Sequence, residues 1–272
     1  MKCFCKNEYA TLYNGDCTDV LKEMIANNMK VDKVITSPPY NIIRPNSVDR
    51  GYDVYKDGMS NDDYCKWIVS IFELYDKILN TNGCVMMNLS YGTENTTIMN
   101  EVVYNVIKRT NFTLADIIVW KKQSATPNNV SSNKMTRICE YIYIYCRRKE
   151  FNTFTSNKKI IKYRDTGQAI YENLFNFIEA ANNDYSSNLN KATFSTELVS
   201  ELIDRYVLDT DIVLDNFSGT GTTLYACMLR HIKSIGIELS EAQCIEAKER
   251  IIGIEIEDKK NKNNILNLFD FI

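Results

Sequence analysis

The sequence reads IVLDNFSGTGTT over residues 212–223, an apolar run that ends in an acid and passes into a glycine turn. The residues that follow, LYAC at 224–227, suit the first turns of a helix. A strand, a glycine turn and a helix in this order form a typical nucleotide-cofactor site, because glycines let the backbone approach a ligand without a Cβ in the way. The stretch therefore predicts an α/β fold with a cofactor at the end of this strand.

A second short strand downstream ends in another acid. Residues 235–238 read IGIE, and Glu238 lies near the position, about 20 residues past the glycine turn, where a ribose-binding acid is expected. The turn itself has the pattern Phe-x-Gly-x-Gly over residues 217–221, not the Gly-x-Gly-x-x-Gly of dinucleotide sites. A cofactor with a ribose but no pyrophosphate fits this pattern better, and S-adenosylmethionine is such a cofactor.

Another apolar strand, far upstream, stops at two prolines. Residues 34–41 read VITSPPYN, a buried strand followed by a rigid loop. The prolines fix φ and remove two backbone donors, and the ring of Tyr40 offers a flat stacking surface. Together they predict a small polar cup that suits a planar group with an exocyclic amine. Taken alone, the stretch is also compatible with an ordinary proline turn after a core strand.

In this combination and order, the two stretches resemble the amino-group DNA methyltransferases of the beta class. In that family a Ser/Asp/Asn-Pro-Pro-Tyr/Phe tetrapeptide precedes the Phe-x-Gly-x-Gly loop. The resemblance covers nearly the whole chain apart from about residues 150–185. It implies a Rossmann-like, mostly parallel sheet with helices on both faces, in circularly permuted order, with S-adenosyl-L-methionine as cofactor. It divides the chain into a catalytic half (1–120), an inserted DNA-recognition region that includes edge strands of the core (121–188) and a cofactor-binding half (189–272).

The resemblance also implies roles for individual residues. The catalytic set is Ser37, Pro38, Pro39 and Tyr40, in which the serine hydroxyl and the first proline's carbonyl accept the hydrogens of the target amine. The tyrosine ring stacks on a base that has been flipped out of the duplex. The cofactor set consists of Asp16, Cys17, Ser37, Phe194, Asp215, Phe217, Gly219, Thr220, Gly221, Thr222 and Glu238.

Within the cofactor set, Asp16 is expected to meet the adenine and Glu238 the ribose. Phe194 belongs to the segment NKATFSTEL at 190–198, which occupies the slot of the family's segment beside the methionine end of the cofactor. That segment often begins with His and ends in Phe-Pro or Lys-Pro, whereas this chain has Asn190 and Phe194-Ser195.

The target amine is either cytosine N4 or adenine N6. In the family a serine before Pro-Pro leans toward cytosine N4 and an aspartate toward adenine N6, in part because a carboxylate accepts more strongly than a hydroxyl. We therefore favour cytosine N4 slightly. Two alternatives remain: a protein-glutamine or RNA amino methyltransferase, whose relatives usually place the cofactor loop first, and a DNA-binding relative that has lost catalysis.

The composition limits the setting in which the protein works. The chain has 272 residues, of which 44% are hydrophobic, and no apolar run approaches the ~20 residues of a membrane span. Nine cysteines without a Cys-x-x-Cys pair and a single histidine predict no metal site and a reduced compartment. We expect a cytoplasmic protein of prokaryotic or phage type. A homodimer and a cognate restriction endonuclease are compatible partners that the sequence leaves open.

Because the net charge is −3, the protein can bind double-stranded DNA only through a local basic patch. Basic and amide residues gather between the two motifs, in a polar loop and in a basic cluster beyond residue 146. A solvated face is the alternative for the cluster. The predicted DNA contacts are Lys121, Lys122, Asn128, Asn129, Lys134, Arg147, Arg148, Lys158 and Lys159.

The periodicity of apolar residues places the remaining elements. We expect strands at about 33–37 and 83–89, an antiparallel edge pair at 117–120 and 141–145, and helices at about 60–80, 94–109 and 196–207. The alternation of Tyr and Ile at 141–145 favours an aromatic core face over a base-stacking surface. The Lys/Asn-rich tail at 258–264 is expected at the surface.

Overall fold

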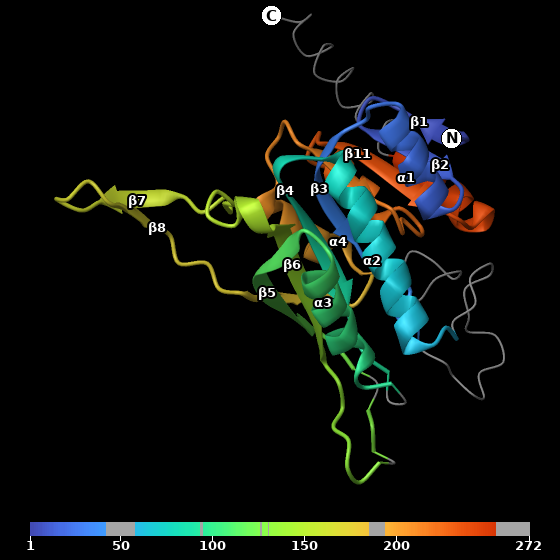
Figure 1. Ribbon diagram of the computed structural model, residues 1–272, viewed down its shortest axis with the longest axis horizontal. Helices are drawn as coiled ribbons and strands as arrows, with labels where there is room; N and C mark the ends of the chain where they lie inside the picture. The colour runs from blue at the N-terminus through green and yellow to red at the C-terminus, as the bar shows by residue number, and fades with distance from the viewer. Residues whose placement is uncertain (42–57, 93–94, 126, 130, 185–193, 254–272) are drawn as a thin grey trace, which may run out of the picture.

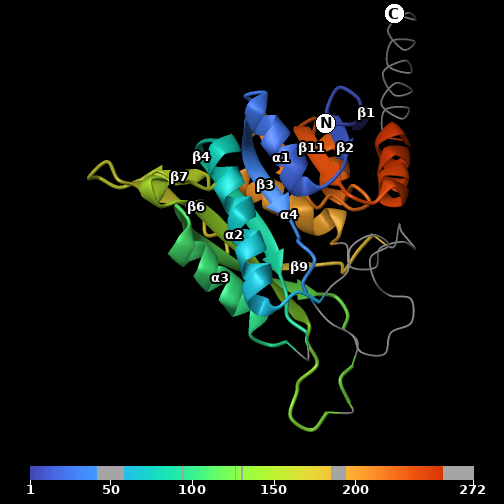
Figure 2. The same ribbon diagram turned by 45° about the vertical axis from the view of Figure 1, so that its right-hand side comes forward.

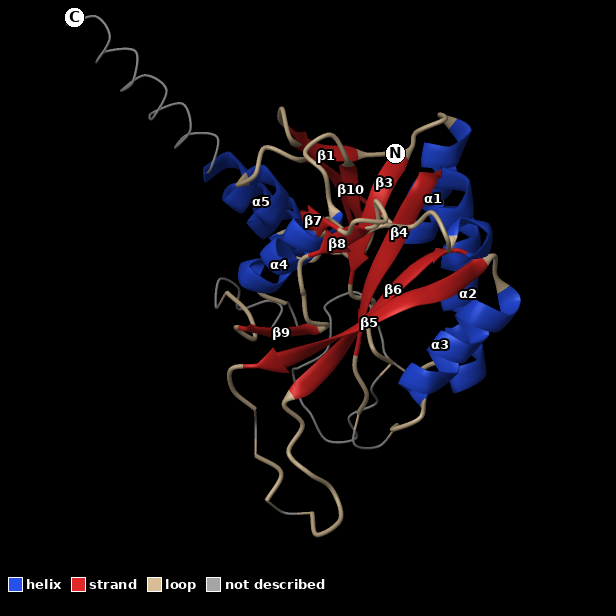
Figure 3. Cartoon of the chain, turned by 90° about the vertical axis from the view of Figure 1, so that its left-hand side faces the viewer, coloured by secondary structure: helices blue, strands red, loops and turns tan. Residues whose placement is uncertain are grey.

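The computed structural model describes residues 1–41, 58–92, 95–125, 127–129, 131–184 and 194–253. These residues form a nine-stranded sheet in the order β1-β2-β11-β10-β3-β4-β6-β5-β9, with helices on both faces (Figures 1 and 3). The predicted Rossmann-like fold is therefore confirmed. Residues 190–193 of the cofactor-side segment and the tail at 258–264 lie outside the described residues.

The strands of the sheet are short on the cofactor side and long on the other side. Their bounds are β1 Cys3–Lys6, β2 Ala10–Asn14, β3 Val31–Thr36, β4 Leu79–Leu89, β5 Phe112–Lys122, β6 Cys139–Arg147, β9 Phe177–Ala180, β10 Ile212–Asp215 and β11 Lys233–Glu238. β1 and β6 pair antiparallel with their neighbours, and the other pairings are parallel. We call the end at which β2, β11, β10, β3 and β4 finish the carboxyl end of the sheet, and the opposite end the amino end.

The helices cover the two faces of the sheet unequally. α1 (Cys17–Ala26), α2 (Asn61–Ile78) and α3 (Ile98–Arg109) lie on one face, and α4 (Thr196–Tyr206) and α5 (Thr222–Met228) on the other (Figure 3). In α2, the Ser60 hydroxyl caps the first turn by accepting from the amide of Asp63. The predicted apolar stripe of α2, with Phe72 fully buried, packs into the larger core. None of the described helices is long and apolar enough to cross a membrane.

The predicted β-strand pair is antiparallel, as expected, but it does not form the edge of the sheet. β9 pairs in parallel with β5 and covers it. β9 and the β1–β2 hairpin were not predicted, because four or five residues give too short a pattern to identify. The tyrosines of β6 face the core as predicted, and Tyr145 is fully buried.

Candidate active site

The two motifs recognised in the sequence meet at the carboxyl end of the sheet. β3 and β10 are neighbouring parallel strands, so the proline loop that follows β3 lies beside the glycine turn that follows β10. The Thr36 hydroxyl donates to Asp215 Oδ1 at 2.8 Å, a buried hydrogen bond that joins the two loops directly. Ligands of open α/β sheets bind in this position, outside the carboxyl ends of the strands.

The glycine turn has a backbone that only glycine adopts without strain. Gly219 and Gly221 have φ values of 53° and 79°, in the left-handed region. A Cβ on Gly221 would also lie 2.9 Å from the Cβ of Ala247. The amide of Gly221 donates to the carbonyl of Ser218 at 2.8 Å, which closes the turn. The turn is thus a compact backbone cradle at the end of β10.

Two acidic residues lie at the ends of the strands next to this cradle. The carboxylate of Glu238, at the end of β11, accepts from the amide of Gly219 and from that of Ser240, both at 2.8 Å. The amide of Gly15, just after β2, donates to the Glu238 carbonyl at 3.0 Å, which brings Asp16 to the same end of the sheet. Asp16 is exposed and caps α1 through Oδ1. Both acids can accept hydrogen bonds from ribose hydroxyls or an adenine amine.

The thiol of Cys17 is buried below these acids. Burial, and then the neighbouring charge of Asp16, raises the pKa of Cys17 to about 12. A thiol with that pKa stays protonated at neutral pH and offers an apolar wall and a weak donor, not a nucleophile.

Asp215, which was predicted to contact the cofactor, has hydrogen-bond partners within the protein. Its side chain is buried, and its oxygens accept from the hydroxyls of Thr36 and Thr223 and from the amide of Phe217. Burial raises its pKa to about 6 in spite of these hydrogen bonds. The side chain therefore joins strand, turn and helix beneath the site.

The remaining residues of the cofactor set surround the cradle. Thr222 Oγ1 accepts from Arg250, and the buried hydroxyl of Thr220 has no hydrogen-bond partner within the part of the chain that is described. Phe217 is half-buried, and its ring contacts that of Trp67 edge-on at a centroid distance of 5.5 Å. This combination of a glycine cradle and two nearby acids fits S-adenosylmethionine.

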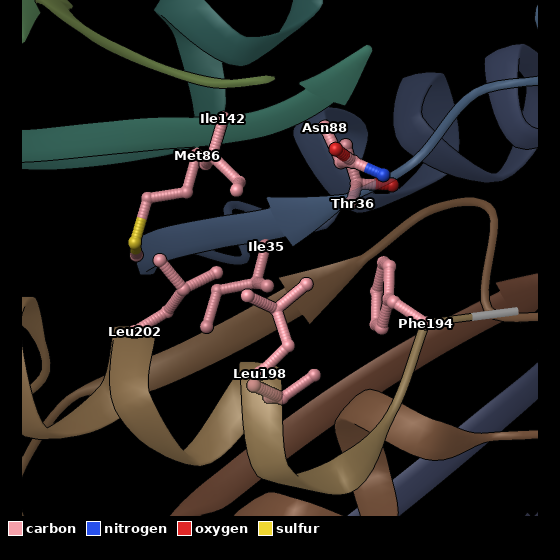
Figure 4. A pocket seen from close by; sticks show the side chains of 9 residues that line it. Ile35, Thr36, Met86, Asn88, Ile142, Phe194, Leu198 and Leu202 are labelled. Carbon is pink, nitrogen blue, oxygen red and sulfur yellow. The ribbon is translucent and has the colours of Figure 1, made fainter. Parts of the chain in front are cut away.

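Phe194 contributes to a small pocket under the proline loop. The pocket is lined by Ile35, Thr36, Met86, Asn88, Ile142, Phe194, Leu198, Val199 and Leu202. Figure 4 shows Thr36, Asn88 and Phe194 at the same end of it, with Met86 and Leu202 at the other. The predicted methionine-end residue therefore lies close to the end of β3, from which the proline loop begins.

The proline loop is held stiffly, as its sequence predicts. The Tyr64 hydroxyl, from α2, donates to the Pro39 carbonyl at 2.5 Å. Asn41 has a φ of 53° and is buried, and its side chain bonds to the backbone of Gly58 and Met59. Ser37 and Tyr40 remain half-buried, with Ser37 Oγ 3.0 Å from Tyr40 Oη. The serine and the aromatic ring thus lie together at the mouth of the cup.

Behind this cup lies a polar network that the sequence did not predict. Glu140 Oε2 accepts from the hydroxyl of Tyr40 at 3.1 Å and from Asn88 Nδ2 at 2.9 Å. Asn88 Nδ2 also lies 2.7 Å from Tyr40 Oη, and the ammonium of Lys122 pairs with Glu140 Oε1. The available signals were Asn88 within the apolar run 84–89 at the end of β4 and Glu140 near the start of β6.

The two neighbouring lysines at the end of β5 therefore have different surroundings. Lys122 was predicted to contact DNA, but its ammonium is engaged with Glu140 and lies 5.2 Å from the centre of the Trp120 ring. Lys121, on the opposite side of the strand, forms an ion pair with Glu179 of β9 at 2.8 Å. Alternation along a strand separates their environments.

The polar loop between β5 and β6, residues 123–138, extends from the carboxyl end of the sheet (Figures 1 and 2). Among its predicted DNA contacts, Asn129 and Lys134 are exposed and Asn128 is half-buried. The Asn128 side chain donates to the Lys134 carbonyl at 3.3 Å, which ties the two sides of the loop together. The loop that carries these three residues leaves the sheet at its carboxyl end, where the proline loop also lies.

The basic cluster lies elsewhere, and this corrects the predicted patch. β6 runs antiparallel to β4, so its last residue, Arg147, is at the amino end of the sheet. Arg147 is only 6% exposed and bonds to Asp76, Glu150 and carbonyls at the end of α2. Arg148 donates to two backbone carbonyls, those of Ile107 and Phe112. Neither arginine is available to a duplex at the proline loop.

Lys158 and Lys159 are exposed but also remote from the cup. They precede a two-stranded hairpin, β7 (Ile160–Tyr163) and β8 (Ala169–Tyr171), which projects to the left in Figure 1. The adjacent amide of Asn157 donates to the Arg205 carbonyl, near the end of α4. That end of α4 leads into the first residues of β10, at the amino end of the sheet. The predicted patch thus splits into a loop near the site and a cluster far from it.

Comparisons with known proteins agree with this arrangement. A family model described as DNA methylase, and named for N6 and N4 methyltransferases, matches residues 31–249. The chain is 24% identical to the type II methyltransferase M.HinfI of Haemophilus influenzae, over 94% of this chain and 70% of that protein.

Solved structures share the fold. The cytosine-N4-specific PvuII DNA methyltransferase aligns with a TM-score of 0.68 and 17% identity, over 92% of this chain and 90% of that one. The M1.HpyAVI–SAM complex aligns with a TM-score of 0.61 and 22% identity, over 89% and 99%. The order of the two motifs, their meeting at the carboxyl end of the sheet and the match to the family model lead to one conclusion. The chain belongs to the N6/N4 DNA methylase family.

Proposed function

We propose that this chain transfers a methyl group from S-adenosylmethionine to N4 of a cytosine that has been flipped out of duplex DNA. The observation that carries the proposal is the meeting of the Ser37–Tyr40 cup with the glycine cradle through the Thr36–Asp215 hydrogen bond. The coarser activity, methylation of an amino group in DNA, is that of the family.

The target amine is a poor nucleophile because its lone pair is delocalised into the ring. The cofactor supplies a methyl group that its sulfonium charge already activates. The protein must then orient the amine and draw its hydrogens onto acceptors as the nitrogen becomes tetrahedral. Ser37 Oγ and the carbonyl of Pro38 are those acceptors in our proposal. No thiol nucleophile is needed, which agrees with the raised pKa of Cys17.

In our proposal the cup takes an extrahelical base, because enzymes that modify a base cannot reach its target atom inside a stacked duplex. Flipping costs a few kcal/mol, and stacking on an aromatic ring contributes about 1–3 kcal/mol per base. Tyr40 provides that ring, and its position is fixed by the hydrogen bonds of its hydroxyl to Asn88 and Glu140. The ring is therefore already oriented before the base binds, and it loses little conformational entropy on binding.

Two observations support cytosine over adenine. The acceptor before the two prolines is a hydroxyl, and the carboxylate of Glu140 is only 8% exposed and lies behind Tyr40. The target amine thus meets a neutral acceptor. The similarity in fold to a cytosine-N4-specific enzyme points in the same direction.

The polar loop at 123–138 is the proposed DNA-recognition element. Asparagine side chains can pair with adenine edges in the major groove, and lysines can hold phosphate or guanine. Asn129 and Lys134 are exposed at the end of the sheet that carries the cup, so a duplex with one base in the cup passes this loop. The basic hairpin region lies at the other end and is not part of the proposal.

The deciding experiment incubates the protein with labelled S-adenosylmethionine and duplex DNA, followed by digestion to nucleosides. We expect the label in N4-methylcytosine. Label in N6-methyladenine would overturn the choice of base but not the reaction class. Label in RNA or in protein glutamine, with none in DNA, would overturn the substrate. Binding of cofactor and DNA without any transfer would identify an inactive DNA-binding relative.

A further inference from the structure

We infer that Glu140 is a positioning residue that forces the Ser37 hydroxyl to act as an acceptor toward the target amine. The inference rests on the proposed function and adds a residue that none of the motifs contains. A serine hydroxyl can either donate or accept, so an enzyme that uses it as an acceptor must control where its single hydrogen points. The network behind the cup provides that control.

The first element of control is the carboxylate itself. Glu140 lies near the start of β6, is 8% exposed, and has partners on both oxygens. An ionised carboxylate only accepts hydrogen bonds. Tyr40 Oη lies 3.1 Å from Oε2, so the phenol's hydrogen is committed to Glu140. The ion pair with Lys122 holds the other oxygen.

The second element is the amide of Asn88, which fixes the remaining role of the phenol oxygen. Asn88 Nδ2 donates to Glu140 Oε2 at 2.9 Å, and this sets the orientation of the amide, because its oxygen would be repelled there. The same nitrogen lies 2.7 Å from Tyr40 Oη and donates to it. With its hydrogen committed to Glu140, Tyr40 Oη can only accept from its other neighbours.

Ser37 is the neighbour that this arrangement orients. Its Oγ lies 3.0 Å from Tyr40 Oη, and the only hydrogen available for that contact is the one on the serine. The Ser37 hydroxyl therefore donates inward to Tyr40, and its lone pairs face the cup. If the phenol turned its hydrogen toward Ser37 instead, the serine hydrogen would point at the incoming amine and oppose it.

Double substitution tests this chain of hydrogen bonds. Glu140→Gln lets the new amide donate to the phenol and reverse its polarity, and Tyr40→Phe keeps the stacking ring but removes the hydroxyl. In single-turnover methyl transfer to duplex DNA, each variant should be slower by roughly 10- to 100-fold, the loss expected for one charge-assisted hydrogen bond. Cofactor affinity measured by calorimetry should be unchanged. The double variant should lose no more than the slower single one.

Glu150→Gln is the matched control. Glu150 is also buried, at 6% exposed, and also forms an ion pair, with Arg147, but at the amino end of the sheet. The folded control protein should transfer methyl groups at the wild-type rate. The inference would be overturned if the rate losses of the two single variants multiplied in the double variant, or if the control lost as much activity as they do. In either case, methylation of DNA by the wild-type protein would still support the proposed function. A wild-type protein that methylates no DNA would overturn both.

Discussion

One strand, β6, contributes to an ion pair with a buried glutamate at each end, and the two pairs differ in what surrounds them. At the carboxyl end, Glu140 and Lys122 connect to Tyr40 and Asn88 at the proposed cup. At the amino end, Arg147 bonds to Glu150 and to carbonyls at the end of α2. Similar chemistry thus serves positioning at one end of the sheet and cohesion at the other.

The largest effect that we expect belongs to the amino end. Arg147→Met leaves two acids, Asp76 and Glu150, without their cation, and exposes carbonyls at the end of α2. Breaking a buried pair in this way costs about 3–5 kcal/mol of unfolding free energy. Urea unfolding measures the loss. Arg148→Met, whose guanidinium is exposed, should cost much less, and equal costs would refute the assignment.

A pH dependence should distinguish the carboxyl end. Burial raises the pKa of Asp215 from 3.8 to about 6, so this group favours the folded state below pH 4 and loses that contribution as the pH rises through 6. The change corresponds to about 3 kcal/mol. Asp215→Asn should remove this part of the dependence. We would compare the unfolding free energies of both proteins between pH 4 and 7, where parallel curves would contradict the argument.

At the amino end the sign reverses for Asp76. Burial alone would raise its pKa, but hydrogen bonds from Asn111 and Arg147 outweigh it, and the pKa is lowered. Asp76 therefore stabilises the folded protein above the pKa of the unfolded chain, and this contribution is lost as the pH falls through its folded pKa. The two acids thus act in opposite directions over the acidic range.

The cofactor cradle should respond to the loss of one acid. Glu238→Ala should weaken S-adenosylmethionine binding by roughly 10- to 100-fold, because hydrogen bonds to a charged group contribute about 1.5–3 kcal/mol. Calorimetry on the folded variant measures this. Glu241→Ala, an exposed acid three residues further on, is the control and should bind normally. Unchanged affinity in the Glu238 variant would remove the assigned role.

The smallest effect separates the two basic regions. Lys134→Ala, in the loop at the carboxyl end, should lower the salt dependence of DNA binding by about one unit of slope, as for one lost phosphate contact. Lys158→Ala, beside the remote hairpin, should leave the slope unchanged. The opposite result, with Lys158 affecting the slope and Lys134 not, would mean that DNA crosses the other end of the sheet.

The fold and the two motifs could be predicted from the sequence because their signals are local. Prolines stop β3, and Gly219 and Gly221 adopt the left-handed backbone that the turn requires. The acids at the ends of parallel strands are expected to lie close together, because these ends meet at one edge of the sheet. Because each of these features depends on residues that are close together in the chain, the amino-acid sequence alone is enough to predict them.

The network and the basic cluster could not be predicted, because each depends on how distant strands pair. Asn88 and Glu140 meet only in the antiparallel register of β4 with β6. The same antiparallel direction carries Arg147 to the amino end, although it is close in sequence to the polar loop. Residues that are close in sequence, such as Arg147 and the polar loop, therefore lie at opposite ends of the sheet. Residues that are far apart in sequence, such as Asn88 and Glu140, are brought into contact by strand pairing.

The central claim is that methyl transfer to a base amine takes place at the carboxyl end of the sheet, with Ser37 Oγ accepting a hydrogen bond from that amine. Wild-type protein and Ser37→Ala, incubated side by side with labelled S-adenosylmethionine and duplex DNA, test it most directly. We predict labelled N4-methylcytosine with the wild type and a rate lower by roughly 100- to 1,000-fold with the variant, as when one preorganised hydrogen-bonding group of an active site is removed. Cofactor affinity should be the same in both. Equal rates of methyl incorporation would contradict the account.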